Sequence, residues 1–163
     1  MRTTIYFLTD NGTAPIGVRR TVIREGEKSL AEAALNALLA GPSPTESNEG
    51  IGSAIPSGVT LRSFSTRGFG ETEAVVDLSG LPESANGVDR VRMITEVTRT
   101  LVGVSGLQRV WLHDDGHPWG LWDTHGGMPD RPHDYGELLG FYRVCASKPG
   151  TETVEGDCFT ALP

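Results

Sequence analysis

Residues 113–127, HDDGHPWGLWDTHGG, gather three of the four histidines of the chain with three aspartates and two tryptophans. Imidazole nitrogens and carboxylate oxygens are ligands that zinc prefers. A metal site in this stretch would use His113, His117, Asp123 and His125. No two ligands have the fixed spacing of a helical zinc motif such as H-E-x-x-H, so a metal-binding protein or metal-dependent hydrolase is the alternative hypothesis.

The same stretch also fits a tight turn between two strands. Asp115–Gly116 is a strong hairpin signal, because glycine adopts a positive φ without steric cost. Before this turn, side chains alternate as on the two faces of a strand, with Val110 and Leu112 on one face and Trp111 and His113 on the other. Pro118 restricts the returning segment to a sheet edge or a loop.

Nucleophilic catalysis finds no support in the residue pattern. HGG at residues 125–127 is similar to an oxyanion-hole sequence, but the chain has no G-x-S-x-G elbow and no S-x-x-K. Ser53 has no base nearby in the sequence and is interpreted as a turn serine. Gly50 and Gly52 are not followed by Gly-Lys-Ser/Thr, as a phosphate loop requires. We therefore predict no catalytic residues, no enzyme activity and no cofactor.

Composition and charge exclude several classes of partner. The 163 residues are 37% hydrophobic and 21% charged, which is typical of a folded domain. A formal net charge of −7 at pH 7 argues against nucleic-acid binding. No apolar run is long enough to span a bilayer, so no membrane insertion by this segment is expected. No secretory leader precedes the first strand, so the chain is either cytosolic or has lost a leader.

The elements around these motifs predict an α+β fold. Ser29 and Glu32 form the capping box of one helix, which Gly41 and Pro42 end. Asp89 is expected to cap a second helix, whose core-facing stripe is Met93, Ile94, Val97 and Leu101. Strands are expected within residues 3–12, 17–26, 60–66, 72–80 and 107–113. The fold class is therefore a small mixed or antiparallel sheet with two helices packed on one face.

Two regions lie outside these elements. Residues 43–58 are polar and predict a long irregular connection, with Ile51 and Ile55 as its apolar anchors. The tail predicts a short β-hairpin, with a disulfide between Cys145 and Cys158 worth roughly 3 kcal/mol. The alternative is two separate thiols in a reducing compartment.

The order of these segments resembles the GerMN domain family of sporulation, spore-germination and bacterial envelope proteins. LNALLAGPSPTESNEGIGSAIPSGVTL matches the family pattern of a helix ending in Leu-Leu-x-Gly-Pro, a polar loop and an Ile-Pro-x-Gly turn before a strand, and VVDLSG matches its Val-Asp-Leu-Ser strand end. The resemblance implies a ring-building-motif-like fold, with a GerMN-like domain at 1–127 and a C-terminal extension at 128–163. It also implies an extracytoplasmic protein, often a lipoprotein, without established catalytic residues.

The resulting prediction is a non-catalytic interaction or scaffold module of the bacterial cell envelope. Aromatic residues are enriched at binding hot spots, so the candidate partner contacts are Trp119, Trp122 and Tyr135. The expected partner is another envelope protein or cell-wall material, and self-association is a further possibility by analogy of fold. We expect membrane anchoring through a segment that precedes this sequence.

Overall fold

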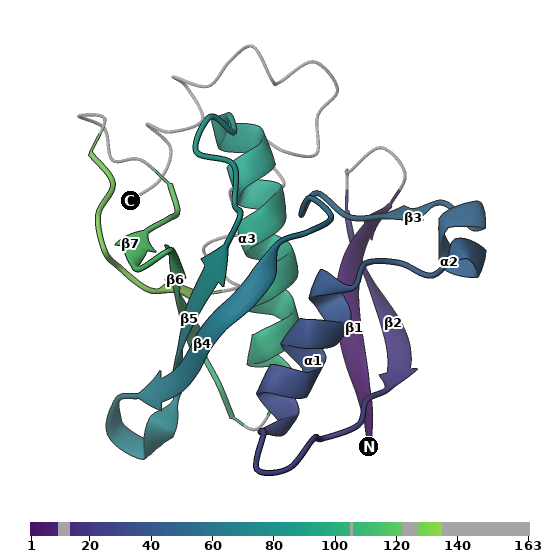
Figure 1. Ribbon diagram of the computed structural model, residues 1–163, viewed down its shortest axis with the longest axis horizontal. Helices are drawn as coiled ribbons and strands as arrows, with labels where there is room; N and C mark the ends of the chain where they lie inside the picture. The colour runs from purple at the N-terminus through teal and green to yellow at the C-terminus, as the bar shows by residue number, and fades with distance from the viewer. Residues whose placement is uncertain (10–13, 105, 122–126, 135–163) are drawn as a thin grey trace.

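Two β-sheets enclose a layer of helices (Figure 1). The computed structural model describes residues 1–9, 14–104, 106–121 and 127–134. The first sheet has the order β2–β1–β3 and is antiparallel throughout. Its strands are β1 (Arg2–Thr9), β2 (Pro15–Thr21) and β3 (Ile51–Gly52).

The second sheet begins with the hairpin that the sequence predicted. β4 (Thr60–Arg67) and β5 (Glu73–Ser79) pair antiparallel, and a short 3-10 turn, η1 (Phe69–Glu71), lies between them. β5 pairs in parallel with β6 (Arg109–Asp114), because a helix connects the two strands. Two short segments then pair with opposite ends of β6, namely β7 (His117–Pro118) and β8 (His133–Asp134).

Three α-helices connect the strands. Two of these helices were predicted from the sequence, and the third was not. α1 (Leu30–Leu39) begins at the expected capping box, in which Ser29 Oγ accepts a hydrogen bond from the Glu32 N–H at 3.1 Å. α2 (Pro44–Asn48) lies within the connection expected to be irregular, and Ser43 and Glu46 form a second capping box there. Local S-x-x-E chemistry therefore begins both helices.

α3 (Gly87–Val102) is capped by a different residue from the one expected. The Asn86 side chain accepts a hydrogen bond from the Asp89 N–H at 2.8 Å, so Asn86 is the N-cap and Asp89 lies in the first turn. The prediction of Asp89 as the cap was wrong by one helical turn. In the described part of the chain, no helix is both long and apolar enough to cross a bilayer.

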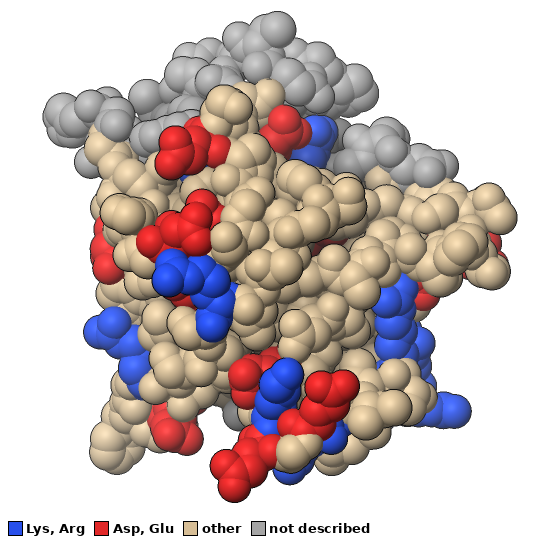
Figure 2. Space-filling view, in the orientation of Figure 1, with Lys and Arg blue, Asp and Glu red and all other residues tan. Residues whose placement is uncertain are grey.

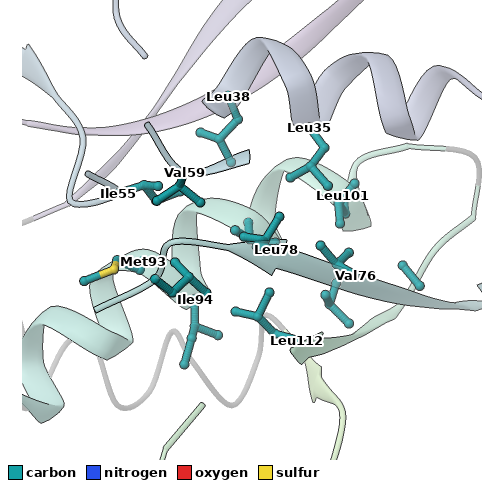
Figure 3. Packing of buried hydrophobic residues seen from close by; sticks show 14 of the residues in the cluster. Leu35, Leu38, Ile55, Val59, Val76, Leu78, Met93, Ile94, Leu101 and Leu112 are labelled. Atoms are coloured by element: carbon teal, nitrogen blue, oxygen red, sulfur yellow. The ribbon is translucent and has the colours of Figure 1, made fainter. Parts of the chain in front are cut away.

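The core fills the space between the sheets and the helices (Figure 3). Buried side chains converge from α1, α3, β5 and β6, including Leu35, Leu38, Val76, Leu78, Ile94, Leu101 and Leu112. The predicted stripe of α3 is buried, and Ile55 anchors the loop before β4. The α+β class is confirmed, although the strands form two sheets rather than one.

α3 is buried on its polar positions as well, because the first sheet covers the side that the second sheet leaves open. Thr100 Oγ1 accepts a hydrogen bond from the Tyr6 N–H of β1 at 3.0 Å. The fully buried Glu96 accepts one from the Ala54 N–H at 3.0 Å, which ties the loop before β4 to α3. Burial raises the pKa of Glu96 to about 8, and hydrogen bonds from Ser53 and backbone groups oppose this shift.

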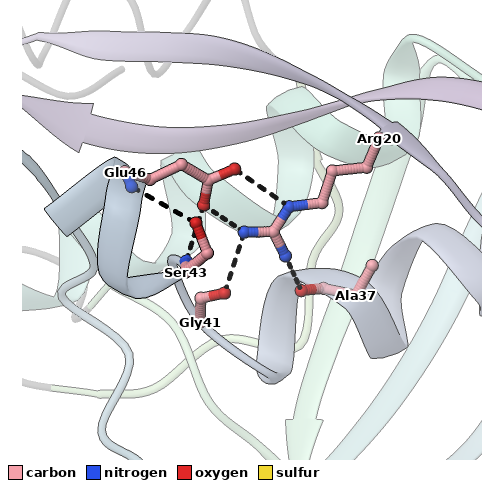
Figure 4. A network of polar contacts seen from close by, with 5 residues as sticks. All are labelled: Arg20, Ala37, Gly41, Ser43 and Glu46. Atoms are coloured by element: carbon pink, nitrogen blue, oxygen red, sulfur yellow. Dashed lines mark hydrogen bonds and ion pairs between the residues drawn. The ribbon is translucent and has the colours of Figure 1, made fainter. Parts of the chain in front are cut away.

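Arg20 of β2 joins the first sheet to the end of α1 (Figure 4). Its guanidinium donates to the carbonyl oxygens of Ala37 at 3.2 Å and Gly41 at 3.1 Å, and it pairs with the Glu46 carboxylate. The hydrogen bond from Arg20 is the main reason why the pKa of Glu46 lies below its usual value. A single arginine thus satisfies helix-end carbonyls and holds α2 in place.

Candidate interaction surface

The second sheet turns one face away from the helices, and we call this the outer face. Alternation defines it, because Ala74, Val76 and Leu78 of β5 are fully buried against the helices. Their neighbours and the residues paired with them point the other way. The outer face therefore consists of Arg62, Ser63, Arg67, Glu73, Val75, Asp77, Arg109, Trp111 and His113.

Trp111 lies at the centre of a polar cluster on the outer face. Its indole Nε1–H donates to Glu73 Oε2 at 2.7 Å, and the Arg67 guanidinium lies over the ring, 4.3 Å from the centroid. Arg67 and Arg109 flank the same carboxylate, with N–O distances of 3.9 and 4.0 Å. Both arginine side chains are 54% exposed. Tryptophan and arginine are the residue types most enriched at binding hot spots.

A second group of charges fixes the turn after β6 to the same face. Asp77 accepts a hydrogen bond from the Gly116 N–H at 2.9 Å, and Arg62 lies 3.4 Å from Asp77 and 3.6 Å from Asp115. Asp115 and Gly116 both have positive φ, at 48° and 81°, as the two central residues of a type I′ turn require. The predicted tight turn between β6 and β7 is therefore confirmed.

The two described histidines of the 113–127 stretch diverge. The register pairs His113 with Pro118 and His117 with Asp114, so the two imidazoles belong to opposite faces of the sheet. His113 Nε2 lies 2.8 Å from Asp130 Oδ1, and His117 Nδ1 lies 3.0 Å from the Asp115 carbonyl oxygen. No group of three metal-ligand side chains occurs among the described residues. The other two proposed ligands, Asp123 and His125, lie outside them.

Comparison with known proteins identifies the fold just described. The Germane family model, described as sporulation and spore germination, matches residues 4–119. The chain belongs to the Germane family. The GerMN resemblance is thereby confirmed over residues 4–119.

Solved structures agree with the Germane assignment. The first GerMN domain of the sporulation protein GerM from Bacillus subtilis is similar at a TM-score of 0.55 and 21% identity, over 82% of this chain and 96% of that one. The tandem GerMN domains of the same protein are similar at a TM-score of 0.56 and 22% identity, and the match covers 82% of this chain and 45% of that one. A Clostridium perfringens chain named as a lipoprotein is similar at a TM-score of 0.54 and 15% identity, and the match covers 86% of this chain and 91% of that one. No curated protein matches.

The Germane match ends at Trp119, whose indole packs inside the domain. Trp119 is 4% exposed, so it offers almost no surface to a partner, and the Arg90 guanidinium lies 4.3 Å from its ring centroid. Arg90 also donates to the carbonyl oxygens of Glu83, Ala85 and Gly120, at 2.6, 3.0 and 3.1 Å. Burial lowers the pKa of Arg90 to about 10, so the guanidinium stays charged at neutral pH. Arg90 thus attaches the end of the Germane domain to α3.

The remaining predicted site residues lie outside the described part of the chain. They are the candidate contacts Trp122 and Tyr135 and the cysteines Cys145 and Cys158, so the proposed contacts and disulfide stay predictions. The boundary at residue 127 also stays a prediction. Trp111 lies on the face of its strand that alternation in the sequence predicts, but it is not among the predicted contacts. The signal in the sequence that could have indicated this contact was the presence of Arg67, Glu73 and Arg109 on neighbouring strands.

Proposed function

We propose that this Germane domain is a non-catalytic protein-interaction module of the bacterial envelope and that the outer face is its contact surface. The observation that carries the proposal is the partly buried Trp111, held between Arg67 and Glu73. A role in the envelope is supported by the family description and by two similar structures, one named as a sporulation protein and the other as a lipoprotein.

The chemistry of the outer face favours a protein over cell-wall glycan. A sugar ring would need an open face of the indole, whereas the Arg67 guanidinium occupies one at 4.3 Å. The ion pairs around Glu73 and Asp77 are partly exposed, and such pairs contribute only about 0–1 kcal/mol to stability. They can therefore exchange for pairs with a partner at little cost in folding free energy. A protein surface with charges of both signs fits this arrangement.

Site-specific photo-cross-linking tests the contact surface. A cross-linkable residue is placed at Ser63, on the outer face, or at the exposed Thr21 of β2 as a control, in cells that produce the protein at its native level. We expect a cross-linked protein from position 63 only, and its loss in a Trp111→Ala variant that keeps its melting temperature. Equal cross-linking from both positions, or a cross-link that survives Trp111→Ala, would contradict the proposal.

Cross-linking and a sedimentation assay together separate the other occupants. A cross-linked species with twice the mass of the chain would identify self-association. Trp111-dependent sedimentation of the purified domain with cell-wall sacculi would replace the protein partner by glycan, and so would contradict the proposal.

We also propose that the domain is extracytoplasmic and anchored through a segment that precedes this sequence. The support is the name of one similar structure, which is a lipoprotein from Clostridium perfringens. Protease added to intact protoplasts should digest the domain while a cytoplasmic marker survives. Protection equal to that of the marker would refute this location.

A further inference from the structure

A groove with an apolar floor lies between the start of α1 and the β4–β5 hairpin. Its volume is about 400 Å³, and Leu30, Phe64 and Leu107 contribute the floor. The hairpin and the first turn of α1, whose residues line the groove, lie at the lower end of the molecule in Figure 1. The groove is lined by neither Trp111 nor the Arg67 and Glu73 side chains around it, so its centre is distinct from that of the outer face.

Among the residues that the structure describes, carboxylates line the groove and no lysine or arginine does. Glu27 and Glu32 come from the α1 side, and Glu71 comes from the hairpin. Figure 2 shows acidic side chains on both sides of the hollow at the lower end of this face, with basic side chains beside them. Glu32 also accepts a hydrogen bond from the Ser29 N–H, so the capping box closes the start of α1 to an anionic ligand. An acidic lining is the electrostatic complement of a cationic ligand.

The hairpin tip beside the groove presents an apolar side chain directly to solvent. Phe69 is fully exposed, and the residues around it have positive φ, at 83° for Gly68, 73° for Gly70 and 53° for Glu71. A positive φ is uncommon for a residue other than glycine, so the backbone at Glu71 is held in a costly conformation. The tip is thus shaped to project a phenyl ring next to an acidic, apolar-floored groove.

We propose that this groove docks a basic segment of a partner protein. An apolar side chain of that segment packs on Leu30, Phe64 and Leu107, flanking lysines or arginines face Glu27 and Glu71, and Phe69 closes over the bound chain. Charge complementarity favours a basic partner, because the groove is acidic and the whole chain has a formal net charge of −7 at pH 7. The same charge opposes the insertion of Phe69 into an anionic membrane. The inference goes beyond the proposed function, since it concerns a second surface with its own partner chemistry.

The test uses a fluorescein-labelled peptide, KKFKKLKK, and its acidic counterpart, EEFEELEE, titrated with the whole chain and read by fluorescence anisotropy at 0.1 M salt. The basic peptide should bind and the acidic peptide should not. Glu71→Gln should weaken binding about fivefold, and Phe69→Ser should weaken it about tenfold. Each has a matched control elsewhere on the surface, namely the exposed Glu49→Gln and Ile23→Ser, which should stay within twofold of the wild type.

Two further readouts complete the test. Amide chemical-shift changes on adding the basic peptide should concentrate at Leu30, Thr66 and Gly70, which line the groove. Trp111→Ala should bind the peptide as the wild type does, so a failure here is distinguishable from a failure of the outer-face proposal. Equal effects of Glu71→Gln and Glu49→Gln, or shifts spread over other surfaces, would overturn the inference. Phe69-dependent binding to phosphatidylglycerol vesicles would overturn it in favour of a membrane surface.

Discussion

Replacing Glu96 by glutamine should remove a large pH dependence of stability. Glu96 is fully buried in α3, and its Oε2 atom accepts the Ala54 N–H at 3.0 Å. Burial raises the pKa of this carboxyl from 4.5 to about 8 in the folded chain. The folded state therefore binds a proton that the unfolded state releases above pH 4.5. The stabilisation is fully present below pH 4.5 and is lost as the pH rises to about 8.

The magnitude follows from the width of that pH window. Each pKa unit corresponds to 1.36 kcal/mol, so between pH 5.5 and pH 8 the wild type should lose about 3 kcal/mol of unfolding free energy relative to Glu96→Gln. Glutamine keeps an oxygen for the Ala54 N–H and carries no charge. Urea unfolding followed by tryptophan fluorescence at both pH values measures the difference, and titrations common to both chains cancel.

The exposed Glu49 supplies the matched control, since Glu49→Gln should leave the pH profile of the wild type unchanged. Parallel pH profiles for the wild type and Glu96→Gln would refute the reasoning, because they would mean that Glu96 ionises alike in the folded and unfolded chains. A Glu96→Gln variant that is less stable than the wild type at pH 8 would refute it as well.

Two further predictions concern stability. Arg90→Met should lower the unfolding free energy by about 3 kcal/mol, because three backbone carbonyls lose a charged donor, whereas the exposed Arg24→Met should change guanidinium chloride unfolding little. Gly17→Ala should lower the unfolding free energy by about 1–3 kcal/mol, because the added Cβ would lie 2.8 Å from Thr4 Cγ2. Thermal unfolding measures this loss, and Gly52→Ala is the control, because a Cβ there would meet nothing within 4 Å. Unchanged unfolding of Arg90→Met or Gly17→Ala would contradict the packing described.

Local signals in the sequence predicted the elements whose chemistry is local. The Ser29 and Glu32 capping box, the Asp115–Gly116 turn and the β4–β5 hairpin all formed as expected. The second capping box, Ser43 and Glu46, had the same spacing but lay in a polar segment without an apolar stripe. Its five-residue helix depends on Arg20, which comes from a strand 26 residues earlier in the chain.

The rest depended on long-range packing. The apolar stripe of α3 predicted one buried face, whereas the polar Thr95, Glu96 and Thr98 are buried too. Nothing in the periodicity of α3 indicates the first sheet, whose strand β1 meets the helix at Thr100. The outer face has the same origin, since Trp111 becomes notable only when Arg67 and Glu73 lie on neighbouring strands. Residue type and spacing suggested a metal site at the histidines instead. The register places His113 and His117 on opposite faces of the sheet.

The hydrogen bond between the Tyr6 N–H and Thr100 has a consequence for how the chain matures. In the described part of the chain, β3 pairs with β1 only at Leu8 and Thr9, so α3 covers the edge of β1 at Tyr6. An uncovered strand edge is a template for pairing with other chains. Because 94 residues separate the two partners, a chain emerging from a ribosome or a translocation pore carries this edge bare until α3 has followed it. Aggregation of the nascent chain is therefore a matter of timing, and a chaperone acting on the first ninety or so residues would shield β1.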